Sequence, residues 1–518
     1  MERLAGRVIL LWGWPRRLAA FVAGALATLA LAPVDFPAIC FAAFPVLVWL
    51  LDGTPVAGTF RQRFLPAFSA GWWFGFGWFL SGMWWLGVPF LSASPHAWAL
   101  PLVVAGPPAL LALFYGVATL IARLLWSDGV GRIAALAFGF GVVEWLRATL
   151  FPGSGWNAVG HAAMPVPLMM QAAQLVGIAG MSTLAVFVFS APALLGTRLH
   201  AVGGLVMAGL LIAFQTGYGY VRIATHPEAE TFLPVRIVQP ALAPATPFEE
   251  TFRAYLDLSA TPVAEGAARR QLILWPELSV PDVLAERPDL LDKMTQIVSP
   301  DAVLVAGALR DEGKAGTRRL YNAALLIDQT GIADATDKLH LLPLRDYFAP
   351  PFIQRGAAAK REAEDELYLA GSVRRLLNIS ENVDALPLIG LEALASPPRD
   401  SMVRESDIIL NPANYAAFSG TPASHQHLRQ ARIRAIQSDL PLLIATANGV
   451  SAAIDSRGRI VGALAGGTHG VLDVSLPLSR KEPTQIGDIA LQGLTFSAIF
   501  GMFALLVTIC VDISGRRN

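Results

Sequence analysis

Long apolar runs separated by short polar segments fill the first part of the chain, and one more apolar run lies alone near the C-terminus. Most of these runs approach the ~20 residues that an α-helix needs to cross a bilayer. The pattern therefore predicts an α-helical membrane bundle of about eight spans. The predicted spans cover residues 18–32, 38–51, 64–91, 98–125, 132–150, 167–196, 201–218 and 488–511.

The first apolar run follows a basic arm and has two interpretations. The sequence Ala-Leu-Ala at residues 30–32 resembles a cleavage site, so one alternative is a cleaved signal peptide. Further apolar runs follow at once, which favours a retained first span. The basic residues of the arm are Arg3, Arg7, Arg16 and Arg17.

Positive charges predict the orientation of the spans. With the N-terminus in the cytoplasm, the arginine-bearing loops fall on the cytoplasmic side, whereas the loops near residues 33–37, 92–97 and 151–166 carry no Lys or Arg. The long polar segment then lies outside, which in a Gram-negative cell is the periplasm, and the protein is a multi-pass protein of the inner membrane. The arginines are Arg61, Arg63, Arg123, Arg132, Arg198, Arg516 and Arg517.

From residue 234 onward the pattern changes to short β-branched runs separated by turns and helices. Apolar strands that alternate with helices predict a layered α/β or α+β fold whose sheet is covered on its faces. We therefore expect a membrane region at 1–221, an outer domain at 222–482, and a last membrane helix with a cytoplasmic tail at 483–518. Predicted strands are 235–239, 271–275, 302–308, 323–328, 386–391, 408–410, 442–447 and 451–455, and predicted helices are 248–265, 288–298 and 425–438.

Composition supports the membrane assignment and excludes several other classes. Of the 518 residues, 54% are hydrophobic and 15% charged, and the mean hydropathy is +0.51, which is too apolar for an ordinary soluble protein. The formal net charge is zero, so nothing indicates nucleic-acid binding. The two cysteines, Cys40 and Cys510, lie in apolar runs near opposite ends, which excludes a disulfide framework or a cysteine zinc site.

Two residues that follow predicted strands are candidates for acid–base chemistry. Glu277 comes after Trp275 and a proline at the end of an apolar strand, where partial desolvation suits a general base. Lys338 lies just past another strand and could stabilise an oxyanion. The alternatives are a structural acid or helix cap for Glu277 and a solvated side chain for Lys338.

Other polar residues are weaker candidates. Asp346 and Tyr347 could form a polar loop near the site, and Glu392 could orient Lys338 or a backbone amide. His425 and His427 are two residues apart on a predicted helix and face apart, so a zinc site is not expected. The charged segment 356–384 is interpreted as a solvated helix face without chemistry.

Within the predicted spans, Glu144 and Arg147 are the ionisable residues that need an explanation. They lie near the outer end of one helix, where they could pair and hold the loop 151–157. A snorkelling structural pair is the alternative.

A set of short motifs along nearly the whole chain resembles the apolipoprotein N-acyltransferases, the membrane branch of the nitrilase (carbon–nitrogen hydrolase) superfamily. Together these motifs are specific, whereas each alone is weak. They are Leu31-Ala32-Pro33, Glu144 to Arg147 with Trp156-Asn157, Val238-Gln239-Pro240, Trp275-Pro276-Glu277, Tyr321-Asn322, Asp337-Lys338 through Tyr347, Gln426-His427-Leu428 through Arg434-Ala435, and Asn448-Gly449-Val450-Ser451 with Ile454-Asp455 and Gly458.

The resemblance implies eight spans and a periplasmic αββα nitrilase-like sandwich. It implies a reaction without a cofactor or metal, in which an acyl chain moves from a membrane phospholipid to the amino terminus of a diacylglyceryl-cysteine lipoprotein. Of the family triad, Glu277 takes the position of the base and Lys338 that of the oxyanion-stabilising residue. Glu392 matches the acid after the nucleophile, and Asp346 replaces a family glutamate. Trp275 and Tyr347 are expected to bind substrate or line the loop.

The family nucleophile is missing. The family pattern Cys-Tyr/Phe-Glu reads Gly390-Leu391-Glu392 in this chain, and a glycine cannot form a thioester acyl-enzyme. Ser396 is the alternative nucleophile. We therefore expect an N-acyltransferase-like membrane protein that is impaired or diverged. The alternative is a non-catalytic binding component, for example a conjugal-transfer protein of the same superfamily, whereas the long outer domain and the lack of inverted repeats argue against a transporter.

Overall fold

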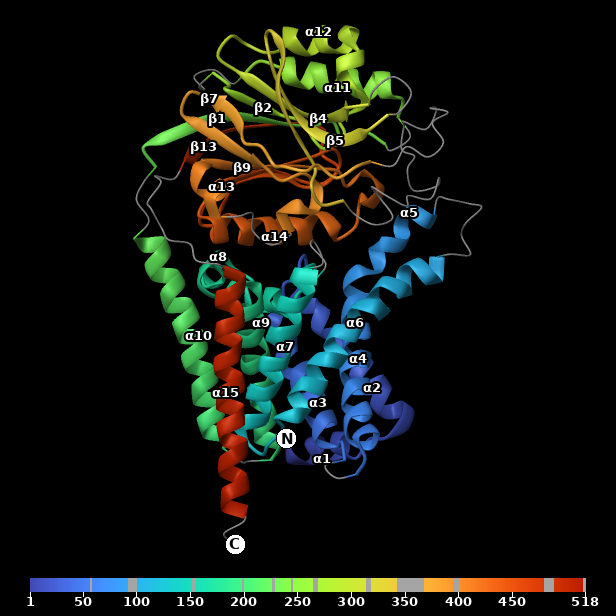
Figure 1. Cartoon of the computed structure of the whole chain (residues 1–518), viewed down its shortest axis with the longest axis vertical. Coiled ribbons are helices and arrows are strands. Elements are labelled where there is room, and N and C mark those ends of the chain that lie inside the picture. The colour runs from blue at the N-terminus through green and yellow to red at the C-terminus, as the bar shows by residue number, and fades with distance from the viewer. Residues whose placement is uncertain are drawn as a thin grey trace. The chain divides into compact units, whose positions relative to one another are not determined.

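A computed structural model describes most of the chain (Figure 1). The described residues are 1–55, 58–91, 100–150, 155–197, 200–225, 229–243, 246–263, 269–313, 318–341, 368–394, 400–478 and 489–515. The chain forms two compact units. The helical unit comprises residues 1–87, 101–226 and 487–518, and the sheet unit comprises residues 88–100 and 227–486.

The helical unit consists of long apolar helices with short 3₁₀ segments between them. Six helices in the described part of the chain are long and apolar enough to cross a membrane, in segments 60–91, 100–124, 130–150, 173–196, 201–224 and 489–510. The main helices are α1 (Glu2–Ile9), α2 (Gly13–Ala27), α3 (Cys40–Asp52), α4 (Phe60–Met83), α6 (Leu100–Leu124), α7 (Val130–Leu150), α8 (Pro167–Met170), α9 (Ala173–Ser190), α10 (Ala201–Ala224) and α15 (Ile489–Gly515). The first two predicted spans, 18–32 and 38–51, correspond to the shorter helices α2 and α3.

The predicted pairing of Glu144 with Arg147 is confirmed. The two side chains are buried and form an ion pair, with Arg147 Nη2 2.5 Å from Glu144 Oε2. Arg147 Nη1 also donates to the carbonyl oxygen of Trp156 at 3.0 Å, and Glu144 Oε1 accepts from the Val159 amide at 3.3 Å and from the Tyr115 hydroxyl at 3.0 Å. The pair therefore holds the described part of the loop that follows α7, while residues 151–154 lie outside the described residues.

The sheet unit contains two sheets. The seven-stranded sheet has the order β13-β1-β2-β4-β5-β6, with β3 paired to β4, and the six-stranded sheet has the order β12-β11-β10-β9-β8-β7. The strands of the first sheet are β1 (Thr231–Gln239), β2 (Leu272–Leu274), β3 (Val280–Val283), β4 (Val303–Asp311), β5 (Leu320–Asp328), β6 (Gly331–Asp337) and β13 (Gly470–Leu478). Those of the second are β7 (Leu377–Ser380), β8 (Val383–Pro387), β9 (Ile408–Ala413), β10 (Leu442–Thr446), β11 (Ser451–Ile454) and β12 (Ile460–Leu464).

Three apolar clusters make this unit a four-layer α/β sandwich. One cluster joins the facing sides of the two sheets, including Leu274 from β2 and Leu410 from β9. A second packs α11 (Phe248–Ala260) and α12 (Pro288–Gln296) on the outer face of the first sheet, and a third packs α14 (Ala423–Ser438) on the outer face of the second (Figure 1). Short elements of this unit include α5 (Val88–Leu91), η7 (Leu284–Glu286), η8 (Gly390–Leu394), α13 (Asp400–Glu405) and η9 (Ala416–Phe418).

Each predicted strand overlaps an observed strand, but the strand predicted at 386–391 shares only residues 386 and 387 with β8. β8 begins at Val383 and ends at Pro387, because Gly390 takes a left-handed φ and starts the 3₁₀ segment η8. Strands β3, β6, β7, β12 and β13 were not predicted. Residues of β12 and β13 are largely exposed or half-buried and carry Gly, Asp and Ser, so they lack the continuous apolar run that marks the buried strands.

Candidate active site

The topology of the first sheet places Glu277 and Lys338 after strands that end at the same end of the sheet. Strand β2 is parallel to β4, and β6 points the same way as β4 because each is antiparallel to β5. Glu277 follows the carboxyl end of β2, and Lys338 follows the carboxyl end of β6 directly. The two residues therefore leave the same end of the sheet, and their side chains are in contact although β4 and β5 lie between their strands.

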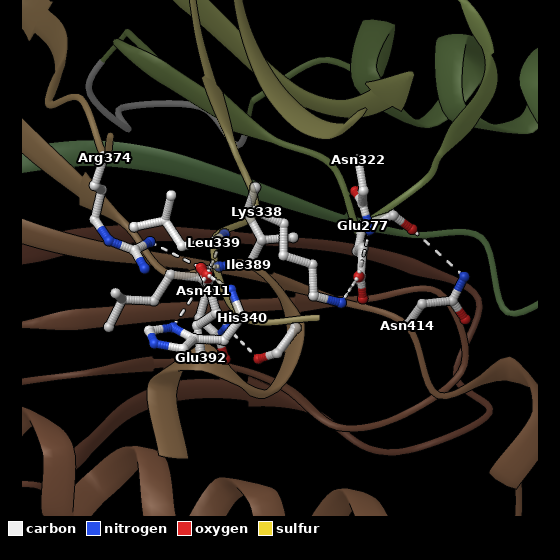
Figure 2. A network of polar contacts seen from close by, with 12 residues as sticks. Glu277, Asn322, Lys338, Leu339, His340, Arg374, Ile389, Glu392, Asn411 and Asn414 are labelled. Carbon is white, nitrogen blue, oxygen red and sulfur yellow. Dashed lines mark hydrogen bonds and ion pairs between the residues drawn. The ribbon is translucent and has the colours of Figure 1, made fainter. Parts of the chain in front are cut away.

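The two side chains form a fully buried ion pair. Lys338 Nζ lies 2.9 Å from Glu277 Oε1, and both side chains have no exposed surface. Asn322 on β5 donates from Nδ2 to the same carboxylate oxygen at 2.8 Å (Figure 2). A charged pair held away from water, with an added hydrogen bond to the carboxylate, can serve as a base beside a cation.

Gly390 lies next to this ion pair and contributes a backbone turn, since it has no side chain. Its φ of +60° lies in the left-handed region, where side chains other than glycine are strained. A Cβ built on Gly390 would lie 3.0 Å from Glu277 Oε2, 3.1 Å from Glu277 Oε1 and 3.2 Å from Lys338 Nζ. Any side chain at position 390 would therefore start between the carboxylate and the ammonium.

Glu392 ties this turn to the segment that carries Lys338. Its carboxylate accepts from the amides of Leu339 at 2.7 Å and His340 at 3.0 Å, and from the Ile389 amide at 2.8 Å (Figure 2). Arg374 Nη1 donates at 2.7 Å to Oε2, the oxygen that also accepts from Ile389, whereas Leu339 and His340 donate to Oε1. Burial by itself raises the pKa of Glu392, but the hydrogen bonding of His340 and the charge of Arg374 outweigh it and hold that pKa at about 2.

This depressed pKa predicts a loss of stability in acid. Because the carboxyl of Glu392 binds its proton more weakly in the folded chain, its contribution is present above its ordinary pKa of 4.5 and is lost as the pH falls towards about 2. The shift corresponds to about 3 kcal/mol. We expect Glu392→Gln to lower the stability at pH 7 by about that amount and to flatten the loss between pH 5 and 2, measured by thermal unfolding across pH. Glu381→Gln, at an exposed position, is the control, and equal curves for Glu392→Gln and the parent would contradict the prediction.

A glycine on β4 allows the Glu277 segment to pack closely. A Cβ on Gly307 would lie 2.4 Å from the Leu278 nitrogen and 2.5 Å from the Pro276 oxygen, and the Gly307 amide donates to that oxygen at 3.2 Å. We expect Gly307→Ala to cost about 1–3 kcal/mol, because the crossing backbone must move. Gly470→Ala on β13, where nothing lies within 4 Å, is the matched control in a thermal unfolding comparison. Equal melting temperatures for the two variants would contradict the prediction.

Of the other predicted residues, Trp275 is described by the structure, whereas three lie outside the described residues. Trp275 is buried in the core beneath α11, where its ring stacks on Tyr255 at 4.8 Å and its Nε1 donates to Ser259 at 2.9 Å, so it packs the helix layer rather than lining the site. Asp346, Tyr347 and Ser396 lie outside the described residues. No group of three or more His, Cys, Asp or Glu able to hold a metal occurs among the residues that the structure describes.

Four polar residues of the site were not predicted to be part of it. Arg374 lies in the segment 356–384, which was interpreted as solvated and without chemistry, and this was wrong for Arg374 because it is buried against Glu392. Asn322 lies in a motif used for the resemblance but was given no role. Asn411 and Asn414 lie at the carboxyl end of β9, and a search for polar residues after every apolar strand would have found them.

The comparisons with known proteins agree over both units. The model of the apolipoprotein N-acyltransferase N-terminal domain matches residues 23–191, and the carbon–nitrogen hydrolase model matches residues 395–485. A relative from Rhizobium rhizogenes named apolipoprotein N-acyltransferase is 43% identical over 529 residues, covering 98% of each chain. Relatives of the same name from Sinorhizobium fredii and Brucella suis are 45% and 44% identical, covering 98% and 93% of each chain.

One solved structure, a carbon–nitrogen hydrolase superfamily protein from Xanthomonas campestris, matches 47% of this chain and 90% of its own, with 15% identity and a TM-score of 0.35. The assignment of the chain to a family rests on its identity to these relatives over nearly their full length. It belongs to the apolipoprotein N-acyltransferase family.

Proposed function

We propose that this protein is an apolipoprotein N-acyltransferase-like membrane protein that keeps the base and the cation of the family site but cannot form the covalent acyl-enzyme at residue 390. The observation that carries this proposal is the position of the Cβ that Gly390 lacks, within 3.2 Å of both Glu277 and Lys338. A thioester needs a sulfur atom at that place, and glycine supplies none.

The substrates follow from the family reaction and from the composition of the chain. Membrane phospholipid is the acyl donor, and the amino terminus of a lipoprotein is the acceptor. Glu277 would take the proton of the attacking group, and Lys338 would stabilise the negative charge that develops on the ester oxygen. Without a nucleophile the two-step transfer is blocked at its first step, so the protein binds these substrates but is impaired in the family reaction.

The membrane arrangement is part of the same proposal. The chain forms eight spans in the bacterial inner membrane, with α2 and α3 as the first two and the apolar helices of the helical unit as the others. The sheet unit, predicted at 222–482, lies in the periplasm, and the region 483–518 adds the last span and a cytoplasmic tail. The arginine-rich loops on one side of the spans support this orientation.

The alternative of a conjugal-transfer component gains no support, since the curated relatives described above carry the name apolipoprotein N-acyltransferase over almost their whole length. We therefore keep lipoprotein acylation as the reaction to test.

Complementation in a cell depleted of its own N-acyltransferase tests the proposal. We expect the parent chain to leave lipoproteins diacylated and the Gly390→Cys chain to restore the triacylated form, measured by mass spectrometry of a lipoprotein amino-terminal peptide. Triacylated lipoprotein made by the parent chain would contradict the proposed impairment. Failure of both chains, with normal levels of each in the membrane, would contradict the proposal that only the sulfur is missing.

A further inference from the structure

A chain of buried side chains reaches from helix α14 to the Gly390 turn. The hydroxyl of Tyr415 is hydrogen-bonded to His427 Nδ1, and His427 Nε2 lies 2.6 Å from Asn411 Oδ1. Asn411 Nδ2 in turn donates to the carbonyl oxygen of Leu388 and, at 2.9 Å, to that of Gly390. Tyr415, His427 and Asn411 are all buried. These three side chains, named here the Tyr415–His427–Asn411 relay, end on the two carbonyls that bracket the turn.

The direction of every hydrogen bond in the relay follows from the two carbonyls at its end. A carbonyl oxygen only accepts, so the atom of Asn411 that touches both must be the NH₂ group, and Oδ1 must face His427. Oδ1 also only accepts, so His427 Nε2 must carry the proton. Nδ1 is then the acceptor for the Tyr415 hydroxyl. Burial lowers the pKa of His427 to about 4, although the charge of Glu277 acts in the opposite direction. The lowered pKa keeps the ring neutral with one N–H, as this direction of the hydrogen bonds requires.

The end of β9 is also hydrogen-bonded to the segment that carries Glu277. Asn414 follows β9 and donates from Nδ2 to the backbone carbonyl of Glu277 at 3.4 Å (Figure 2). Asn411 and Asn414 therefore connect the end of one strand to the turn at Gly390 and to the backbone of Glu277. The end of β9 fixes how far residue 390 lies from the carboxylate.

We propose that Asn411, His427 and Tyr415 are positioning residues that hold position 390 in its left-handed conformation, aimed between Glu277 and Lys338. Glycine tolerates other conformations at little cost, so the hydrogen bonds of the relay to the carbonyls of Leu388 and Gly390 add to the bond between Glu392 and the Ile389 amide in keeping the turn in this one. The inference rests on position 390 being the nucleophile position of the proposed function, but it does not depend on acyl transfer.

The titration of a thiol placed at position 390 tests this inference without any reaction. The Gly390→Cys chain, in full length, is alkylated with iodoacetamide across a range of pH. The extent of modification of the peptide that contains position 390 is followed by mass spectrometry, which separates it from Cys40 and Cys510. Free cysteine is measured alongside. Because the relay holds the thiol beside a carboxylate and an ammonium, we expect the midpoint of the alkylation curve to differ from that of free cysteine.

The variants then separate positioning from general stability. Adding His427→Leu or Asn411→Leu to the Gly390→Cys chain is expected to return the midpoint to that of free cysteine. Adding His427→Gln, which can still donate to Asn411 and accept from Tyr415, is expected to keep it displaced. His425→Leu, on the same helix but exposed, is the matched control and is expected to change nothing. A midpoint equal to that of free cysteine in Gly390→Cys alone, or one that His427→Leu leaves displaced, would overturn the inference.

A second measurement decides the case if the leucine variants fail to fold. Nitrogen-15 spectra of the histidine-labelled parent chain, with His427→Gln to assign the signal, report the tautomer of His427. We expect the neutral form with the proton on Nε2 at pH 7. A proton on Nδ1 instead would reverse the hydrogen bonds of the relay and refute it. This result is independent of the complementation experiment, so the inference and the proposed function can fail separately.

Discussion

Purified Gly390→Cys protein is expected to become acylated on the introduced thiol when it is incubated with phospholipid, whereas the parent protein is not. The reason is local: the side chain at position 390 begins 3.0 Å from a carboxylate oxygen of Glu277 and 3.2 Å from the amine of Lys338. A sulfur attached there needs a base and an oxyanion partner, and both are in place.

The expected chemistry is a balanced transfer. Glu277 removes the thiol proton, the sulfur attacks the ester carbonyl of the phospholipid, and Lys338 stabilises the oxyanion. The ester C–O bond then breaks, and the lysophospholipid oxygen takes the proton from Glu277. The products are a thioester on the protein and a lysophospholipid, which supply the mass increase and the second product to be measured.

Gly390→Cys is expected to raise the rate of acylation greatly and to lower the stability of the fold only slightly. Removing the nucleophile of a hydrolase costs on the order of 10⁶ in kcat, so the parent chain should show no detectable acylation. A side chain in the left-handed region costs about 1–2 kcal/mol, which a folded protein with a fully buried core tolerates. Gly390→Ala carries the same strain without the sulfur and is therefore the matched control.

Intact-protein mass spectrometry before and after hydroxylamine, which cleaves thioesters, measures the outcome. Adding Glu277→Gln to the Gly390→Cys chain is expected to slow acylation by about 10²–10⁴-fold, because the general base is lost. Acylation of the parent or of Gly390→Ala would show that another group carries the acyl chain. Unchanged acylation after Glu277→Gln would remove the base from the proposed mechanism.

The sequence offered Glu277 and Lys338 as separate candidates, and the family resemblance placed them in one site. Glu277 follows a short apolar run that was predicted as a strand, whereas Lys338 follows β6, whose residues include Gly, Asp and Thr and which was not predicted. Because β4 and β5 lie between their two strands, the contact could not be derived from the pattern of strands. The identification of Gly390 with the missing nucleophile needed the family resemblance, since composition and spacing carry no sign of an absent side chain.

The residues that the sequence did not reveal act through contacts between distant segments. Arg374 lies in a polar stretch whose charges suggested solvent, and only the folded chain shows it bonded to Glu392 and to the Pro387 carbonyl at 2.5 Å. His427 was weighed as a metal ligand and counted in a motif of the resemblance but was given no role, because the pairing of its two nitrogens with Asn411 and Tyr415 depends on how α14 packs on β9. The periodicity of apolar residues and the spacing of motifs along the chain do not predict contacts between such distant segments.

Removal of the cation from the buried pair is expected to be the most damaging single change in stability. In Lys338→Met the carboxylate of Glu277 stays buried, with the Asn322 amide still donating to it but without its compensating charge. Breaking a fully buried ion pair in this way costs about 3–5 kcal/mol. For a unit of this size each kcal/mol lowers the melting temperature by about 2–4 °C, so a drop on the order of 10 °C is expected in full-length protein in detergent.

The double variant with Glu277→Gln and Lys338→Met separates the cost of a stranded charge from the loss of packing. A glutamine keeps the oxygen that accepts from Asn322 and carries no charge, so most of the lost stability should return, because replacing both members of a buried pair is often neutral. Lys293→Met, at an exposed position on α12, is the control and should stay within about 0.5 kcal/mol of the parent. Losses that simply add in the double variant would mean that Glu277 and Lys338 do not interact, and the proposal that this pair supports acyl transfer at position 390 would have to be abandoned.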